Sequence, residues 1–301
     1  MLGIGSALYT GAFDGWLYEY LKQANLERIA SNYFRNITVL YIVGVGSASI
    51  VAGKLYEHSF RLPFMLSFVF SAINIFVVAL IHFEGKQENK SIQIKTTNKF
   101  VTSIKKVGII FIKSREIFAF TVIMCLVEFG FDGIERYYQI ILQNKHISYF
   151  GISNVYTGIT IVSILILLLR NKILEKDIYQ CFCIELGMLG IFVGTFFMLI
   201  SDGWVAYFMI VFSLGSYEII APAKLAYLNS KFDDSIRATS LSIFEFVVSI
   251  FEVLSGVIVE VICDLYGVHR AIEICIMVVF VVTLVFACLN QDVVKSLKYK
   301  L

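Results

Sequence analysis

Two uncharged runs constrain the fold of this chain more than any other feature. They extend from Leu62 to Ile81 and from Ile147 to Leu169. Each is near the ~20 residues with which a helix crosses ~30 Å of hydrocarbon, so we expect both to lie in lipid. The composition agrees, because 58% of the 301 residues are hydrophobic and 16% are charged. Such values are typical of a polytopic membrane protein.

Nine apolar segments of this kind follow one another along the chain. Because a backbone in lipid must satisfy its own hydrogen bonds, and the period-two pattern of a barrel is absent, we expect all nine to be helices. If the first does not span, since it carries Asp14 and Glu19, eight remain. The predicted fold class is therefore all-α, with about nine transmembrane helices. Their ranges are 2–21, 37–53, 62–81, 117–139, 149–169, 178–200, 203–223, 238–262 and 271–290.

The basic residues predict the orientation of the chain. The connections and termini divide into two alternating sets, which hold 20 and 5 of the 25 Lys and Arg residues. Lys and Arg accumulate on the cytoplasmic side of a membrane. We therefore expect a multi-pass protein of the cell membrane with a cytoplasmic C-terminus and, if the first segment spans, an outside Met1. An outside start without a preceding signal suggests that something upstream is missing.

The layout and several short motifs resemble the major facilitator superfamily (MFS) of secondary transporters. The stretch from Gly11 to Glu19 is similar to an acidic motif on the fourth helix of one bacterial branch. The stretches from Arg237 to Ser242 and from Asp264 to Gly267 look like the entry and exit of the eleventh helix. The family joins two six-helix halves by a cytoplasmic loop. The resemblance therefore implies that this chain begins at helix four and lacks helices one to three.

This alignment implies three parts in the chain. Residues 1–82 would be the remainder of an N-terminal bundle with three helices. Residues 83–116, with eight basic residues, would be a cytoplasmic linker. Residues 117–301 would be a C-terminal bundle of six helices.

Small residues recur at every fourth position in two of the segments. They are Gly44, Ala48 and Ala52 in one, and Gly190 and Gly194 in the other. Such a face lets a neighbouring backbone approach closely. We expect these faces to be helix contacts.

Acidic residues inside the segments carry the functional prediction, because an ionisable group at this depth costs several kcal/mol unless it faces a cavity or a partner. No Lys or Arg is expected deep in any segment, so these acids should be partly protonated or face water. Either state suits proton coupling or cation binding. The family layout implies that helices four, seven, ten and eleven line or flank the central cavity. The candidates on them are Asp14, Glu128, Asp132, Glu218, Glu245 and Glu252.

Helical spacing supports two groupings among these acids. Glu128 and Asp132 are four residues apart and share a face. Glu245 and Glu252 belong to a polar stripe that continues to Glu260. A polar stripe in a membrane helix requires water or protein beside it. The alternative to a cavity-facing role is a structural hydrogen bond to a neighbouring helix.

Aromatic and proline positions supply further candidates. Tyr137, Tyr138 and Gln139 lie at the outer end of the predicted 117–139 helix. They either line a substrate mouth or anchor the helix in the interface. Pro222 either hinges or ends the 203–223 helix.

The sequence motifs of metal, redox and nucleotide-binding sites are absent. The six cysteines have no metal or redox spacing, the four histidines have no ligand spacing, and no Walker loop occurs. No nucleophile and base form a recognisable pair, so we expect no enzyme, no cofactor and no metal. The basic central loop is interpreted as an orientation signal and not as a nucleic-acid site. The expected partners are the lipid bilayer, a small solute and protons, and the oligomeric state is left open.

The functional hypothesis is a secondary active transporter of a small amphipathic or cationic solute. It would work by alternating access, with proton-coupled efflux as the expected mode. Two alternatives stay open. One is a facilitated uptake permease, and the other is an N-terminally truncated, transport-inactive MFS fragment.

Overall fold

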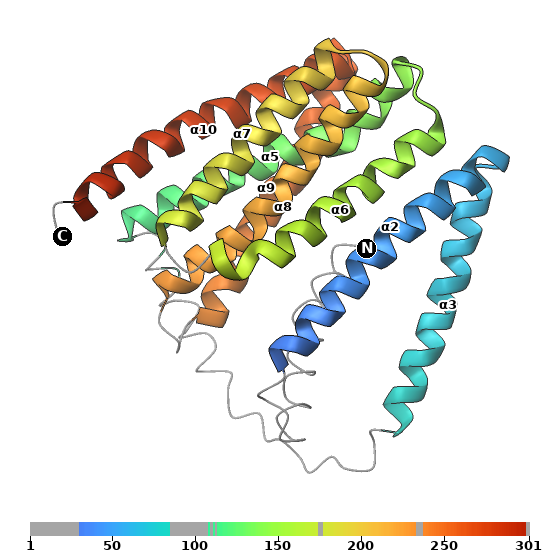
Figure 1. The fold of residues 1–301 in the computed structure, drawn as a ribbon, viewed down its shortest axis with the longest axis horizontal. Coiled ribbons are helices and arrows are strands. Elements are labelled where there is room, and N and C mark those ends of the chain that lie inside the picture. The colour runs from blue at the N-terminus through green and yellow to red at the C-terminus, as the bar shows by residue number, and fades with distance from the viewer. Residues whose placement is uncertain are drawn as a thin grey trace.

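The chain forms a set of long helices in a computed structural model that describes residues 30–84, 108, 111, 113–173, 177–232 and 237–298. No strand occurs within these ranges. The predicted segment 2–21, with Asp14, lies outside them. Figure 1 shows the eight helices: α2 (Ala30–His58), α3 (Arg61–Glu84), α5 (Arg115–Asn144), α6 (Tyr149–Ile173), α7 (Asp177–Ile200), α8 (Gly203–Lys231), α9 (Arg237–Tyr266) and α10 (Val268–Lys298).

Six stretches of the described helices are long and apolar enough to cross a bilayer: Val39–His58, Arg115–Asn144, Tyr179–Ile200, Gly203–Lys231, Thr239–Tyr266 and Val268–Leu289. Shorter apolar stretches, Arg61–Val77 and Tyr149–Leu165, belong to α3 and α6, which have 24 and 25 residues. Large apolar side chains are exposed on the described helices, for example Phe68 on α3 and Val253 and Leu265 on α9. Such exposure is expected where lipid is the solvent. The prediction of a polytopic α-helical membrane protein is confirmed, while the number nine stays a prediction.

The helices from α5 onward pack into a bundle, and α2 and α3 lie along one side of it (Figure 1). Within the bundle α5 packs against α9 and α10, and α7 packs against α8 and α10. The α6 helix lies between α8 and α2, and it supplies the main contact of α2 with the bundle. The buried face of α5 includes Met124, Ile134 and Leu142. The polar side chains described below project from this same helix.

The most extensive contact between two described helices is that of α7 with α8, where small residues meet. A Cβ atom added to Gly194 would lie 2.7 Å from the carbonyl oxygen of Met209 on α8. The neighbouring hydroxyls of Thr195 and Ser213 are buried and 2.7 Å apart. Gly190 faces Ser216 in the same way. The predicted contact at Gly190 and Gly194 is confirmed, because only a bare Cα lets the two backbones approach this closely.

The contact of α2 with α6 uses a different face from the predicted one. No described residue lies within 4 Å of a Cβ added to Gly44, whereas a Cβ on Gly46 would lie 2.8 Å from the Thr160 hydroxyl of α6. Gly53, seven residues further on, faces Ser153 of α6. The contact is therefore made by Gly46 and Gly53 and not by the face that Gly44 begins. Spacing alone identifies a small face but not the side on which the partner helix lies.

Pro222 does not end its helix, so the alternative of helix termination is wrong. The α8 helix contains Pro222 and continues for nine further residues to Lys231. Proline has no N–H group, so the carbonyl of Glu218 loses its usual helical partner. The helix predicted to end at residue 223 therefore continues for about two further turns to Lys231, and this extension includes Lys224.

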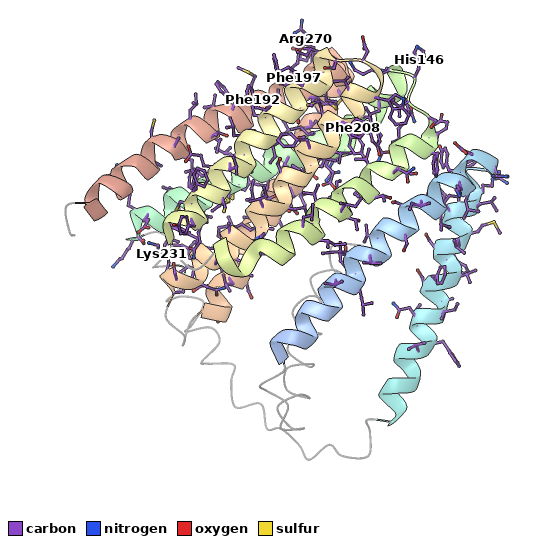
Figure 2. The ribbon with its side chains drawn as sticks, in the orientation of Figure 1. His146, Phe192, Phe197, Phe208, Lys231 and Arg270 are labelled. Atoms are coloured by element: carbon purple, nitrogen blue, oxygen red, sulfur yellow. The ribbon has the colours of Figure 1, made fainter. Side chains whose placement is uncertain are left out.

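The two ends of the bundle carry different charged side chains. Figure 2 shows Lys231 at one end and His146 and Arg270 at the other. At the first end, Lys231 Nζ lies 2.7 Å from Glu116 Oε1. At the second, Lys145 donates a hydrogen bond of 3.1 Å to the Leu199 carbonyl, and Arg270 pairs with Glu273. The first two contacts join α5 to α8 and the end of α5 to α7, whereas Arg270 and Glu273 pair within α10.

Candidate functional site

A buried ion pair joins α5 to α8. The Nζ atom of Lys224 lies 3.4 Å from Oε1 of Glu128, and both residues are buried. The hydroxyl of Tyr217, also on α8, donates a hydrogen bond of 2.6 Å to the same carboxylate oxygen. A lone charge at this depth would be expensive, whereas a paired and hydrogen-bonded carboxylate is tolerated.

A second carboxylate shares the same ammonium group. Glu245 on α9 places Oε1 3.4 Å from Lys224 Nζ, and 54% of its side chain is exposed. Lys224 therefore lies between a buried carboxylate and an accessible one. We call Glu128, Tyr217, Lys224 and Glu245 the charge network. Its four residues come from three helices, so a relative movement of α5, α8 or α9 changes the distances within it.

Aromatic rings fix the position of the charge network. The ring of Phe131 on α5 stacks on Tyr217, with centroids 3.9 Å apart. The Lys224 ammonium lies 5.6 Å from the ring centroid of Phe244 on α9. Such contacts attract the lysine ammonium group through the ring quadrupole. They also restrict the rotamers that the lysine and the tyrosine adopt.

The buried Lys224 corrects the prediction that no basic residue lies deep in a segment. The sequence interpretation ended the segment at residue 223 and assigned Lys224 to a connection. Lys224 instead follows Tyr217 by seven residues, which places both on one face of α8. The buried Tyr227 and Leu228 continue the helix beyond it. The sequence signal that identifies Lys224 is therefore this spacing and the apolar residues that follow.

The other predicted acids of α5 and α9 lie near the charge network without joining it. Asp132 accepts a hydrogen bond of 2.8 Å from Arg136 Nε, one turn along α5. The guanidinium of Arg136 also covers Gly256, since a Cβ there would lie 3.2 Å from Arg136 Nη1. Glu252 is half-buried on α9. The structure therefore brings Glu128 and Glu245 together through Lys224, and pairs Asp132 locally.

The acids that face α6 form a separate group. Glu218 on α8 shares a side-chain hydrogen bond with Ser163 of α6. Glu135 on α5 accepts a hydrogen bond of 3.3 Å from the Tyr156 hydroxyl of α6. Glu135 was not singled out by the sequence patterns, because it adjoins Arg136 near the expected end of its segment. Asp14, the remaining predicted acid, lies outside the described residues.

The predicted mouth residues separate in the structure. Tyr138 and Gln139 line a cavity of 310 Å³ between α2, α3, α5 and α6. Tyr137 projects toward α9, where its side chain meets Cys263. Consecutive residues of a helix point about 100° apart, so three in a row cannot face one site. Two of the three predicted mouth residues therefore line this cavity.

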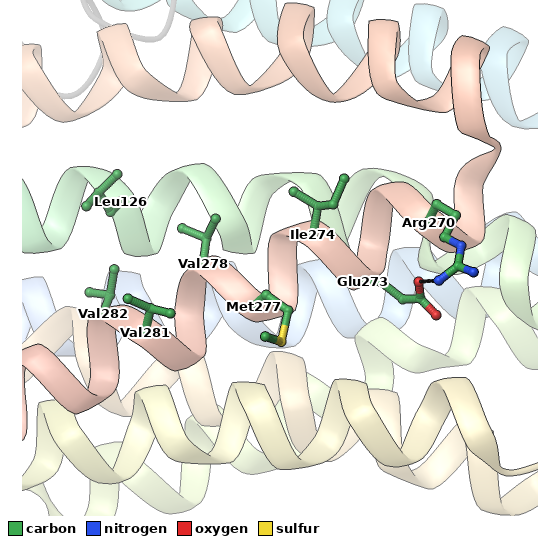
Figure 3. Close-up of a pocket in the computed structure, with 8 residues that line it drawn as sticks. All are labelled: Leu126, Arg270, Glu273, Ile274, Met277, Val278, Val281 and Val282. Carbon is green, nitrogen blue, oxygen red and sulfur yellow. Dashed lines mark hydrogen bonds and ion pairs between the residues drawn. The ribbon is translucent and has the colours of Figure 1, made fainter.

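A second hollow is an apolar groove of 640 Å³ along α10, shown in Figure 3. Arg270 and Glu273 pair at one end, and Leu126 of α5 and Val282 of α10 lie at the other. The wall between them is formed by aliphatic side chains and Met277. None of the predicted site residues lines this groove.

The described part of the chain defines an α-helical, multi-pass membrane protein with ion pairs between its membrane helices. Comparison with known proteins then gives a relative that is similar in sequence. The chain is 27% identical over 277 residues to YxaM of Bacillus subtilis (strain 168), named an uncharacterized MFS-type transporter. The match covers 88% of this chain and 65% of that protein. No protein-family model matches the chain.

This similarity to an MFS-type transporter supports the resemblance that the sequence predicts. The match extends over most of the chain, as the predicted resemblance does. It carries no information on substrate, coupling ion or direction, because the relative is itself uncharacterized.

Proposed function

We propose that this protein is a secondary active transporter of a small amphipathic or cationic solute, coupled to protons through the charge network. The observation that carries the proposal is the position of Lys224 at 3.4 Å from both Glu128 and Glu245. With all three groups ionised the network has one net negative charge. Uptake of one proton or one organic cation neutralises it, and neutrality favours movement through a low-dielectric region.

Two bonding patterns of Lys224 give the coupling a physical basis. When Glu128 is ionised, the ammonium and the Tyr217 hydroxyl both stabilise it. When Glu128 takes up a proton, Lys224 is free to pair with Glu245 alone. Because the two carboxylates belong to α5 and α9, this exchange changes the attraction between those helices. Alternating access requires such a link between protonation and helix position.

The family register supports the same proposal. In it α5, α8 and α9 correspond to the seventh, tenth and eleventh helices, which line or flank the central cavity of the superfamily. The α2 and α6 helices correspond to the fifth and eighth, which also flank that cavity, and they pack side by side. We further propose a location in the cell membrane with a cytoplasmic C-terminus, supported by the unequal distribution of Lys and Arg.

The test is transport of ethidium into proteoliposomes with an imposed pH gradient. We expect the wild-type protein to accumulate ethidium only when the gradient is present. The variant Glu128→Gln should lose this accumulation but keep ethidium exchange in the absence of a gradient, because exchange needs no net proton movement. The matched control, Glu273→Gln, changes an acid at the end of the bundle and should retain both activities.

Three results would count against the proposal. Accumulation that survives in Glu128→Gln would remove this residue from coupling. Wild-type transport that ignores the gradient would favour the facilitated permease. Absence of ethidium transport by well-folded wild-type protein would exclude the proposed solute class.

A further inference from the structure

The cavity between α2, α3, α5 and α6 has the size and the lining of a ligand site. Its volume of 310 Å³ is at the lower end of the roughly 300–1,000 Å³ usual for small-molecule pockets. Four tyrosines and two glutamines contribute to its wall: Tyr56, Tyr138, Tyr149, Tyr156, Gln139 and Gln143. We call it the tyrosine cavity. It lies ten residues of α5 beyond Glu128, about 15 Å along the helix axis, so it is separate from the charge network.

One hydroxyl in this cavity lacks a partner. Tyr138 is fully buried, and its hydroxyl forms no hydrogen bond of acceptable geometry with the described residues. The Gln139 side chain is a polar neighbour of this hydroxyl. A buried hydroxyl without a hydrogen bond is energetically unfavourable. Because the hydroxyl is enclosed in the wall, a ligand with a polar group pairs with it when the Tyr138 ring turns toward the cavity, and this pairing removes the cost.

The lining selects against anions. No Lys or Arg is among the residues that line the cavity. The nearby cations are directed elsewhere, since Lys54 lies 6.0 Å from the Phe150 ring centroid and Arg61 lies 5.6 Å from that of Phe60. Behind the wall, Tyr156 donates its hydroxyl hydrogen to the Glu135 carboxylate. Tyrosine rings backed by a carboxylate attract cations.

The cavity wall also offers an aromatic surface. Tyr56 of α2 and Tyr149 of α6 contact each other in this wall, with centroids 4.9 Å apart and planes tilted by 52°. Below them α2 and α6 are joined by the Ser49 and Thr157 hydroxyls, which are 2.8 Å apart. A ligand that packs against this ring pair therefore contacts both helices near the point where the hydroxyls join them.

We propose that the tyrosine cavity binds a small aromatic cation that has a hydrogen-bonding group. This site goes beyond the proposed transport function, because it needs neither the charge network nor proton coupling. It also joins the two parts that the family register assigns to different bundles, α2 with α3 and α5 with α6. Occupancy therefore stabilises one relative position of these parts over others.

The test is the binding of thioflavin T, an aromatic cation, to the purified full chain in lipid nanodiscs, followed by fluorescence polarisation. Ala52→Trp places an indole in the cavity, since Ala52 lines it. The matched control, Ala48→Trp, changes an exposed alanine one turn earlier on α2. We expect Ala52→Trp to weaken binding about tenfold or more, equivalent to ~1.4 kcal/mol, and Ala48→Trp to leave it unchanged.

Two further variants keep the test decisive if the tryptophan impairs folding. Tyr138→Phe removes one oxygen atom and should weaken binding without affecting the fold. Glu273→Gln changes an acid on α10 that lines neither site and should leave binding unchanged. Binding that responds to Glu128→Gln but not to Tyr138→Phe or Ala52→Trp would place the dye at the charge network and overturn the proposal. Absence of saturable binding to the wild-type protein would overturn it as well.

Discussion

The Nζ atom of Lys224 lies 3.4 Å from Oε1 of Glu128, and less than a tenth of either side chain is exposed. This pair joins α8 to α5, and Glu245 of α9 shares the same ammonium group. Because the pair is enclosed, each partner depends on the other far more than in a surface ion pair.

Removal of one partner should therefore destabilise the folded protein strongly. We expect Lys224→Met or Glu128→Gln to lower the free energy of unfolding, Lys224→Met by about 3–5 kcal/mol because it leaves a buried carboxylate unpaired. The double variant should recover most of the loss. Unfolding in mixed micelles with increasing SDS measures all three. Additive losses in the double variant would show that the two residues do not stabilise each other.

The exposed pair at the end of the bundle provides the contrast. Lys231 lies 2.7 Å from Glu116, a shorter distance than in the buried pair, but 27% and 49% of the two side chains are exposed. We expect Lys231→Met to change the free energy of unfolding by less than about 1 kcal/mol. The same SDS titration checks it. A loss as large as that of Lys224→Met would mean that burial does not decide the strength of these pairs.

The Tyr217 hydroxyl should also stabilise the protein, because the carboxylate that it contacts is buried. Its hydroxyl donates to the buried Glu128 carboxylate at 2.6 Å, and we expect Tyr217→Phe to cost about 1.5 kcal/mol of stability. Tyr227→Phe removes a similar bond of 2.8 Å to Glu116. Glu116 is exposed, so water replaces that bond and the loss should be smaller. Equal losses in the two variants would contradict this explanation.

Two glycine variants test the packing. Gly194→Ala places a methyl group 2.7 Å from the Met209 carbonyl oxygen, and we expect it to destabilise the protein by about 1–3 kcal/mol. Gly44→Ala meets no described residue within 4 Å and should stabilise α2 by about 0.5–1 kcal/mol. Thermal unfolding of the two variants in one detergent compares them. A Gly194→Ala protein as stable as the wild type would show that α7 and α8 separate easily.

The proposed orientation predicts opposite accessibilities for the two ends of the bundle. His146 and Ser230 are both exposed. In a background without the six native cysteines, His146→Cys should react with an impermeant thiol reagent on intact cells. Ser230→Cys should react only after permeabilisation. The reverse pattern would place the C-terminus outside and would contradict the proposed topology.

The class of the fold was readable from the sequence because one local property determines it. Long uncharged runs must form helices in lipid, since each backbone polar group has to be satisfied within its own segment. The approximate positions of α3, α5, α7 and α10 follow from this rule without any knowledge of their neighbours. The helix ends did not follow from it, as the continuation of α8 through Pro222 shows.

The candidate acids could also be predicted from the sequence, because an acid in an apolar run is conspicuous. The residues with which these acids pair could not be predicted. Lys224 looked like a residue of a connection, yet it is buried between Glu128 and Glu245. Gly44 looked like a contact and Gly46 makes one. The chain by itself determined which segments are helices and where charge enters them; the tertiary structure decided which helix faces meet, because contacts between distant segments depend on rotations and heights that no local pattern contains.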